Sequence, residues 1–195
     1  MNKTLAVILI CLFSLSVAVA AKDNFHTTSR KVQPIKNGKL SALYVVKETD
    51  HVAQCMESAA SSRSDVKRCF SATNSTVYDP CFNYLQGQLI CLNSPWDQNA
   101  TVVQLNQPMP NAVPTTTSVV KKINPWAMEL KSGERCVALT GATSGVKGER
   151  INYGCTTTVS LLGDPYRLKQ NVWAIKRYDS QTQEVSEALI AEMFY

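Results

Sequence analysis

Six cysteines are the residues whose chemistry is easiest to assign from the sequence. They are Cys55, Cys69, Cys81, Cys91, Cys136 and Cys155, and a seventh, Cys11, lies in an apolar N-terminal run. Their spacings contain no CxxC pair and no neighbouring pair of histidines, which the common zinc sites would require. An even number of cysteines in an oxidising compartment indicates disulfide bonds instead. We therefore expect three disulfides and no metal.

Hairpin geometry narrows the possible cysteine pairings. The turn-compatible pair Gln86-Gly87 would set two flanking strands side by side, with one pair of cysteines directly opposite each other. Opposed residues of antiparallel strands are close enough for a disulfide. A second pair of cysteines flanks the glycine-rich stretch 141–148, as the two sides of a longer hairpin would. The predicted bonds are Cys81–Cys91 and Cys136–Cys155 from this geometry, and Cys55–Cys69 by elimination.

Candidates for catalysis are few. The chain has two histidines, and His26 lies in a polar N-terminal stretch where nothing would hold a base in place. A Ser-His-Asp arrangement with His51 stays open as an alternative, because such triads assemble in space, but no GxSxG elbow accompanies it. Asp79 and Asp164 could be the paired carboxylates of a glycosidase, although each precedes proline, which is typical of turns. We expect no catalytic residue and no cofactor.

Arg63, Asp65 and Arg68 lie close together between two cysteines. Regular backbone pairing is scarce in such a short connection, and a guanidinium group can bind backbone carbonyls and a carboxylate at the same time. These three residues are therefore expected to act together and fix the connection.

Aromatic and basic residues are the remaining candidates for binding. On a β scaffold, tryptophans are typical of core or cross-strand packing, with a ligand platform as the alternative. They are Trp96, Trp126 and Trp173. The formal charge of +5 is mixed along the chain, apart from one basic stretch formed by Arg30, Lys31, Lys36 and Lys39. This stretch is either a solvated arm or a site of attraction to an anionic surface or polymer. Nucleic acid is not expected, because basic and aromatic residues do not interleave.

The N-terminus has the three parts of a secretory signal peptide. Lys3 precedes an apolar run over 5–19, and small residues occupy the −3 and −1 positions of a cut after Ala20. The run is shorter than the roughly 20 residues that span a bilayer as a helix. Cys11 follows Ile10 rather than a small residue, which does not fit a lipoprotein. We expect cleavage near Ala20 and a periplasmic or secreted protein that is not an integral membrane protein.

The rest of the sequence predicts a flexible leader over 21–40 that ends in a turn at Asn37-Gly38, followed by a series of hairpins. One helical turn is expected over 64–68, with Ser64 as its N-cap. The final segment also fits a helical face, but the preceding hairpins favour a strand. Strands are expected over 42–46, 82–85, 88–92, 100–105, 126–130, 135–139, 150–155, 158–162, 172–178 and 185–194.

Residues 55–82 read CMESAASSRSDVKRCFSATNSTVYDPCF. The recurring positions are Cys55, Ser58, Arg63, Asp65, Arg68, Cys69, Asp79, Pro80, Cys81 and Phe82, continued by Cys91, Pro125-Trp126, Gly133 to Cys136, Ile151 to Cys155, Leu162 to Asp164 and Trp173. This pattern resembles one found in uncharacterised exported bacterial proteins with a six-cysteine framework. Met56 and Lys67 depart from it, because aromatic residues are often expected there. The resemblance implies a disulfide-bonded fold and bacterial export, and implies no activity.

These observations together predict one disulfide-bonded β domain over 41–195, after a signal peptide over 1–20 and the leader over 21–40. Its architecture is expected to be a small antiparallel sandwich or barrel of hairpins with little helix. The favoured function is a non-enzymatic binding or interaction protein of the bacterial envelope or exterior. Its partner would be a cell-wall polymer, an envelope protein or a host molecule. The alternative is a small secreted hydrolase that acts on an extracellular polymer.

Overall fold

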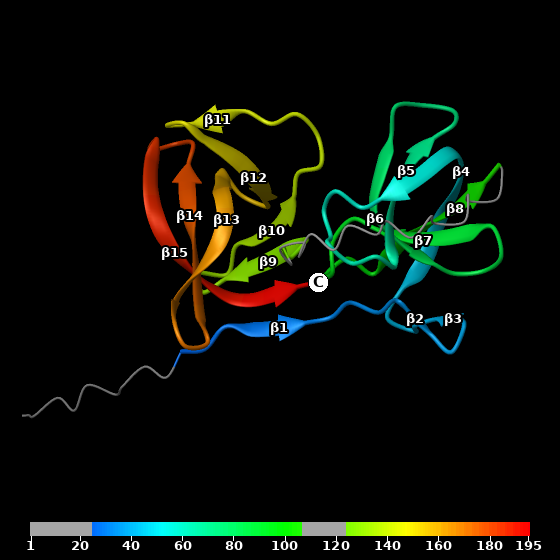
Figure 1. Ribbon diagram of the computed structural model, residues 1–195, viewed down its shortest axis with the longest axis horizontal. Coiled ribbons are helices and arrows are strands. Elements are labelled where there is room, and N and C mark those ends of the chain that lie inside the picture. The colour runs from blue at the N-terminus through cyan, green and yellow to red at the C-terminus, as the bar shows by residue number, and fades with distance from the viewer. Residues whose placement is uncertain (1–24, 107–123) are drawn as a thin grey trace, which may run out of the picture.

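The structure, a computed structural model, describes residues 25–106 and 124–195. Within these residues the protein is all β, and the strands form two barrels that lie side by side (Figure 1). The expected β class is confirmed, with two barrels in place of one sandwich or barrel. The predicted signal peptide over 1–20 lies outside the described residues.

The first barrel is a five-stranded meander in which each strand pairs with the next one along the chain. An odd number of strands leaves the first and the last pointing the same way, so the barrel can close only through a parallel pair. β4 and β8 form that pair. The strands are β4 (Val45–Glu57), β5 (Val66–Ser71), β6 (Val77–Asn83), β7 (Gln88–Leu92) and β8 (Asn99–Leu105).

The second barrel is a six-stranded meander, and its even number of strands permits an antiparallel closure between β15 and β9. A short strand, β11 (Gly145–Val146), pairs with the start of β12 outside this ring. The six strands are β9 (Ala127–Leu130), β10 (Arg135–Ala138), β12 (Glu149–Cys155), β13 (Val159–Lys169), β14 (Val172–Asp179) and β15 (Glu184–Phe194). The ambiguous final segment is therefore a strand, as expected.

The described part of the expected flexible leader is bound to both barrels, which corrects that prediction. β1 (Thr28–Arg30) pairs in parallel with β15, and Val32 is 5 % exposed. β2 (Ile35–Lys36) and β3 (Lys39–Leu40) form a hairpin around the expected turn, where Asn37 and Gly38 both have positive φ. Polar composition suggested a free arm, but polar residues also carry main-chain N–H and C=O groups, which here pair with a strand.

The three predicted disulfides are present, and each joins residues directly opposite each other on neighbouring antiparallel strands. The Cα–Cα distances are 4.1 Å for Cys55–Cys69, 4.0 Å for Cys81–Cys91 and 3.9 Å for Cys136–Cys155. The bonds therefore lie across β4–β5, β6–β7 and β10–β12.

Two local predictions in the first barrel were wrong. In place of the expected helical turn over 64–68, residues 64 and 65 form a turn and β5 begins at Val66, which is buried. The first strand was expected over 42–46, whereas β4 begins at Val45 and continues to Glu57. Most side chains of β4 are exposed on both faces, so the strand lacks the alternation of apolar and polar residues by which strands are recognised.

The expected turns at Asp79-Pro80 and Asp164-Pro165 were also wrong, because both dipeptides lie inside strands. The pairing of β5 with β6 shifts register around Asp79-Pro80, and that of β13 with β14 shifts around Asp164-Pro165. Proline has no N–H to give to a ladder and is tolerated in strands at such irregular places. The Asp79-Pro80 peptide bond is cis.

The two barrels share part of their hydrophobic core. Successive residues of β7 face opposite sides of the sheet. Leu89 belongs to a first hydrophobic cluster, made only of first-barrel residues, and Ile90 belongs to a second hydrophobic cluster. The second cluster includes Trp126 and Phe194 from the other barrel. The apolar run in β7 therefore reflects a strand that is buried on both faces.

Candidate functional site

The chain that precedes the first barrel carries basic side chains into the junction between the two barrels. Arg30 ends β1, beside β15, and Lys36 lies in β2, beside the first barrel (Figure 1). Between them, the Val32 amide donates to the Tyr195 carbonyl at 2.8 Å, and the Tyr195 amide donates to the Arg30 carbonyl at 3.0 Å. These bonds extend the β1–β15 ladder and fix the backbone from which Arg30 projects.

Three further side chains complete the walls of a pocket at this junction. Tyr44 precedes β4, and its amide donates to the Ser41 carbonyl at 2.9 Å. Pro95 lies in the loop between β7 and β8, and Phe194, 2 % exposed, comes from β15. The pocket has a volume of about 240 Å³ and is lined by residues of both barrels and of the segment between them. We call it the basic pocket.

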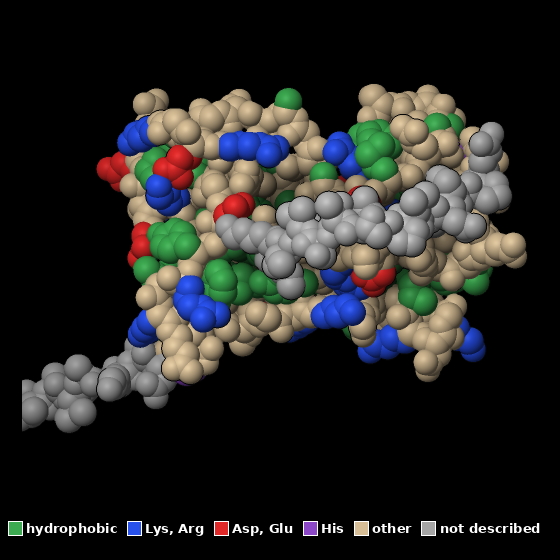
Figure 2. Space-filling model, in the orientation of Figure 1, with side chains coloured by type: hydrophobic (Ala, Val, Ile, Leu, Met, Phe, Trp, Pro, Cys, Tyr) green, Lys and Arg blue, Asp and Glu red, His purple; other side chains and the backbone are tan. Residues whose placement is uncertain are grey.

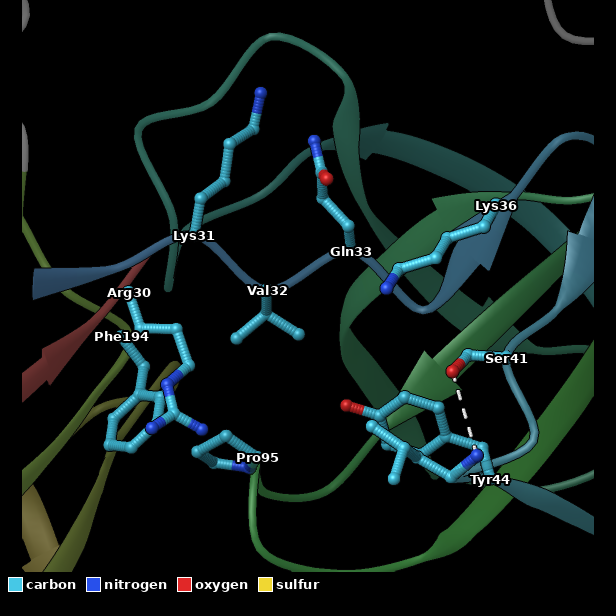
Figure 3. Close-up of a pocket in the computed structure, with 10 residues that line it drawn as sticks. Arg30, Lys31, Val32, Gln33, Lys36, Ser41, Tyr44, Pro95 and Phe194 are labelled. Carbon is cyan, nitrogen blue, oxygen red and sulfur yellow. Dashed lines mark hydrogen bonds between the residues drawn. The ribbon is translucent and has the colours of Figure 1, made fainter.

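Figure 3 shows how the polar groups of the basic pocket converge. The Tyr44 hydroxyl and the Lys36 side chain extend toward its middle from one side, while Arg30 lies over Phe194 on the other. The guanidinium carbon of Arg30 is 5.6 Å from the centre of the Phe194 ring. Lys31 and Gln33 point to the opposite side of the segment from Val32. The arrangement sets cations and a hydroxyl around apolar walls.

The electrostatics of the basic pocket favour an anion. None of its described lining residues is acidic. Glu192 pairs with Arg30 from outside the lining, with Nε to Oε1 at 2.9 Å, and the Arg30 side chain remains 65 % exposed. Burial raises the pKa of Tyr44, and the nearby charge of Arg30 opposes that rise. Tyr44 is therefore a neutral hydroxyl that can donate a hydrogen bond at physiological pH.

The side chains of the basic pocket suit the binding of an anionic group. Arginine can bind a carboxylate or phosphate with two parallel hydrogen bonds, and lysine adds a point charge. Val32, Pro95 and Phe194 supply apolar contact for the part of a ligand next to its anionic group. A small pocket with a few converging polar groups on an apolar floor is the usual form of a ligand site.

Lys and Arg side chains do not form one block elsewhere on the visible surface. Figure 2 shows them spread over both barrels with acidic side chains between them. On the face shown in Figure 2, the basic side chains do not gather into one large positive patch.

Arg63 and Asp65 act together as expected, whereas Arg68 does not join them. Arg63 Nη1 donates to the Val32 carbonyl at 2.6 Å and to the Tyr195 carbonyl at 3.1 Å, and Arg63 Nε donates to Asp65 Oδ1 at 2.9 Å. The Arg63 contact lowers the pKa of Asp65. Arg68 lies in β5 and instead stacks over Phe70, with its guanidinium carbon 5.1 Å from the ring centre. Arg63 therefore joins the first barrel to the segment that carries the basic pocket.

Asp79 holds the connection between β4 and β5 in place. Its carboxylate accepts hydrogen bonds from the Ser58 hydroxyl and from the amides of Ala59 and Ala60, the latter two at 2.9 and 3.1 Å. The Ser58 oxygen accepts in turn from the Ser61 amide at 2.8 Å. Burial raises the pKa of Asp79 despite these hydrogen bonds, which lower it.

The three tryptophans have different surroundings. Trp126 is 1 % exposed and belongs to the shared core, as expected from packing. Trp173 packs at the edge of the second barrel's core, with Arg167 5.3 Å from its ring. Trp96 follows Pro95, contacts Phe194 edge-on at 5.0 Å, and lines a pocket of its own.

The remaining catalytic candidates lie apart from the basic pocket. His51 is exposed on β4, and its own amide donates to Asp50 Oδ1 at 2.7 Å. Tyr78 donates to the other Asp50 oxygen at 2.9 Å, and this bond together with burial raises the pKa of Tyr78 to about 12. Asp164 is exposed and accepts from Asn152 Nδ2 at 3.2 Å.

The basic side chains of the pocket were recognisable from the sequence as a locally basic stretch, but its walls were not. Tyr44, Pro95 and Phe194 come from three distant places in the chain. Each is also an ordinary residue for a strand or a loop, so no local signal marks it.

No family model matches the chain, and neither the curated proteins nor the solved structures contain a match. Nothing helical in the described residues has the length and hydropathy needed to cross a bilayer. Over the same residues, the structure has no cluster of three or more His, Cys, Asp or Glu side chains that could hold a metal ion.

Proposed function

We propose that the protein is an exported, non-enzymatic binding protein that takes an anionic group, a carboxylate or a phosphate, into the basic pocket. The observation that carries this proposal is the convergence of Arg30, Lys36 and Tyr44 around apolar walls, in a pocket whose described lining has no acidic residue. The three disulfides and the predicted signal peptide over 1–20 support export.

The anionic group would belong to a larger molecule of the bacterial envelope or exterior, such as a cell-wall polymer, an envelope protein or a host molecule. Leu43, 68 % exposed, lies at the rim of the pocket and offers contact to the part of the ligand that extends out of it. The resemblance to exported bacterial proteins supports this setting and adds no ligand.

Lys36 and Lys39 provide a matched test, because they pair directly across the β2–β3 hairpin and only Lys36 lines the pocket. Wild-type protein is expected to bind inorganic phosphate or acetate at low ionic strength, as measured by amide chemical shifts in NMR. Lys36→Gln should weaken this binding about tenfold, the lower end for a charge-assisted hydrogen bond.

Lys39→Gln removes the same charge from the same hairpin and should bind like the wild type. Equal weakening in both variants would mean that the anion responds only to net charge. That result, or the absence of binding by the wild type, would overturn the proposal. Acetate and phosphate are titrated separately, so the preferred anion also becomes known.

A further inference from the structure

A second pocket has Trp96 in its wall, and the Trp96 ring contacts Phe194, which lines the basic pocket. It has a volume of about 330 Å³, at the lower end of the range for small-molecule sites. The loop between β7 and β8 contributes Asn93, Ser94, Trp96 and Asp97, and the second barrel contributes Arg135 and Thr156. We call it the Trp96 pocket.

The Trp96 ring is held in place from two sides. Its edge meets Phe194, with ring centres 5.0 Å apart and planes at 75°. The Arg135 guanidinium lies 5.4 Å from the ring centre, and its Nε bonds Glu129 at 3.1 Å. A half-buried indole fixed in this way offers a rigid apolar surface, and binding to it costs little conformational entropy.

The lining of the Trp96 pocket contains one basic and one acidic residue, whereas the described lining of the basic pocket contains no acidic residue. Arg135 is already paired with Glu129, and Asp97 is the acidic residue of the lining. Asp97 Oδ1 accepts from the Asn99 amide at 2.8 Å, which fixes the loop. An anion or a cation would therefore meet one attractive and one repulsive group here, so the pocket favours a neutral ligand.

The polar groups at the rim can both donate and accept hydrogen bonds. Asn93 and Thr156 are exposed, and each carries a donor and an acceptor. A ligand that suits this rim has several groups that donate and accept at once, together with one apolar face for the indole. Hydroxyl groups arranged around a ring with C–H bonds on one face meet both requirements.

We propose that the Trp96 pocket binds a neutral sugar ring of an oligosaccharide, stacked on Trp96 and hydrogen-bonded by Asn93 and Thr156. This inference does not rest on the anion site, because the two pockets have different linings and different charges. A polymer with both neutral sugar rings and anionic groups could fill both.

The test uses three neutral probes, the trimer of N-acetylglucosamine, maltotriose and cellotriose, each at about 10 mM to cover a Kd of about 1 mM. Binding is measured by saturation-transfer NMR on the sugar protons, which needs no tryptophan signal. At least one trimer is expected to bind wild-type protein, and Trp96→Phe should weaken that binding about tenfold. Phenylalanine keeps an aromatic ring against Phe194 while reducing the stacking surface.

Trp173→Phe is the matched control, because Trp173 also lies beside an arginine but lines no described pocket of this kind. It should bind like the wild type, as should Lys36→Gln. Asn93→Ala and Thr156→Val, both at exposed positions, should weaken binding even if Trp96→Phe fails to fold. Failure of all three trimers to bind, or wild-type binding by the variants of Asn93 and Thr156, would overturn the proposal.

Discussion

At the scale of single residues, the half-buried carboxylate of Asp79 makes stability depend on pH. Its pKa in the folded protein is raised by burial, so the folded state binds a proton at Asp79 more readily than the unfolded chain does. The contribution of Asp79 to the free energy of unfolding is therefore largest below the unfolded pKa. It is lost as the pH rises through the folded pKa.

Asp79→Asn should remove this dependence. The asparagine oxygen can accept from the amides of Ala59 and Ala60, and its NH₂ group can donate to the Ser58 oxygen. Urea unfolding of both proteins from about pH 3 to 7 is expected to show the wild type losing stability relative to the variant as pH rises.

Asp164→Asn serves as the control, because Asp164 also precedes proline but is exposed. Parallel stability profiles for wild type and Asp79→Asn would contradict the assignment of the pH dependence to Asp79.

At the scale of elements, each disulfide joins two neighbouring strands, and its effect depends on the loop that it closes. Cys81 and Cys91 are 10 residues apart and both are buried in the first barrel. The double variant Cys81→Ala/Cys91→Ala should lose roughly 3 kcal/mol of unfolding free energy, through the greater freedom of its unfolded chain.

Chemical unfolding of the double variant beside the oxidised wild type provides the measurement. The variant is expected to keep the β6–β7 hairpin, since Phe82 and Ile90 pair within it as well. A loss of unfolding free energy below about 0.5 kcal/mol, as for an ordinary surface change, would show that this disulfide constrains the unfolded chain little.

The hairpins were predictable from sequence because turn residues and apolar alternation are local signals. Gln86-Gly87 and Asn37-Gly38 mark turns that the structure contains. Two cysteine pairs followed from hairpin geometry, and Cys55–Cys69 was left by elimination. The closure of two separate barrels was not predictable, because β4 meets β8 and β9 meets β15 only through long-range pairing. The pocket walls escaped prediction for the same reason, since Tyr44 and Phe194 are neighbours only in the folded chain.

At the scale of the whole molecule, Arg63 ties the first barrel to β15 and to the segment before β2. Its side chain is 12 % exposed and bonds the carbonyls of Val32 and Tyr195 as well as Asp65. Arg63→Ala takes the donor away from the Val32 carbonyl and from Asp65, while the Tyr195 carbonyl keeps its hydrogen bond from the Val32 amide. The variant should lose about 2–3 kcal/mol of unfolding free energy.

Arg167→Ala is the comparison. Arg63 stacks over Phe82 at 5.4 Å, and Arg167 likewise stacks over Trp173 but within a single barrel. Arg167→Ala should lose about 1 kcal/mol or less of unfolding free energy. Equal losses of unfolding free energy in the two arginine variants would contradict the linking role of Arg63.

Far-UV circular dichroism and tryptophan fluorescence are expected to report one common unfolding transition in the wild type, because the shared core couples the barrels.

The pairing of β1 with β15 also has a consequence for the order of folding. The Thr27 hydroxyl, just before β1, donates to the carbonyl of Ile190 in β15, and the two residues are 163 positions apart in the chain. During synthesis, β1 is made long before β15. It therefore has no strand to pair with until both meanders have been synthesised. Each barrel can form by successive pairing of consecutive strands. This pairing is fast because the strands are close in sequence. The basic pocket, by contrast, is assembled late, and a nascent chain that stops short of β15 has no such site.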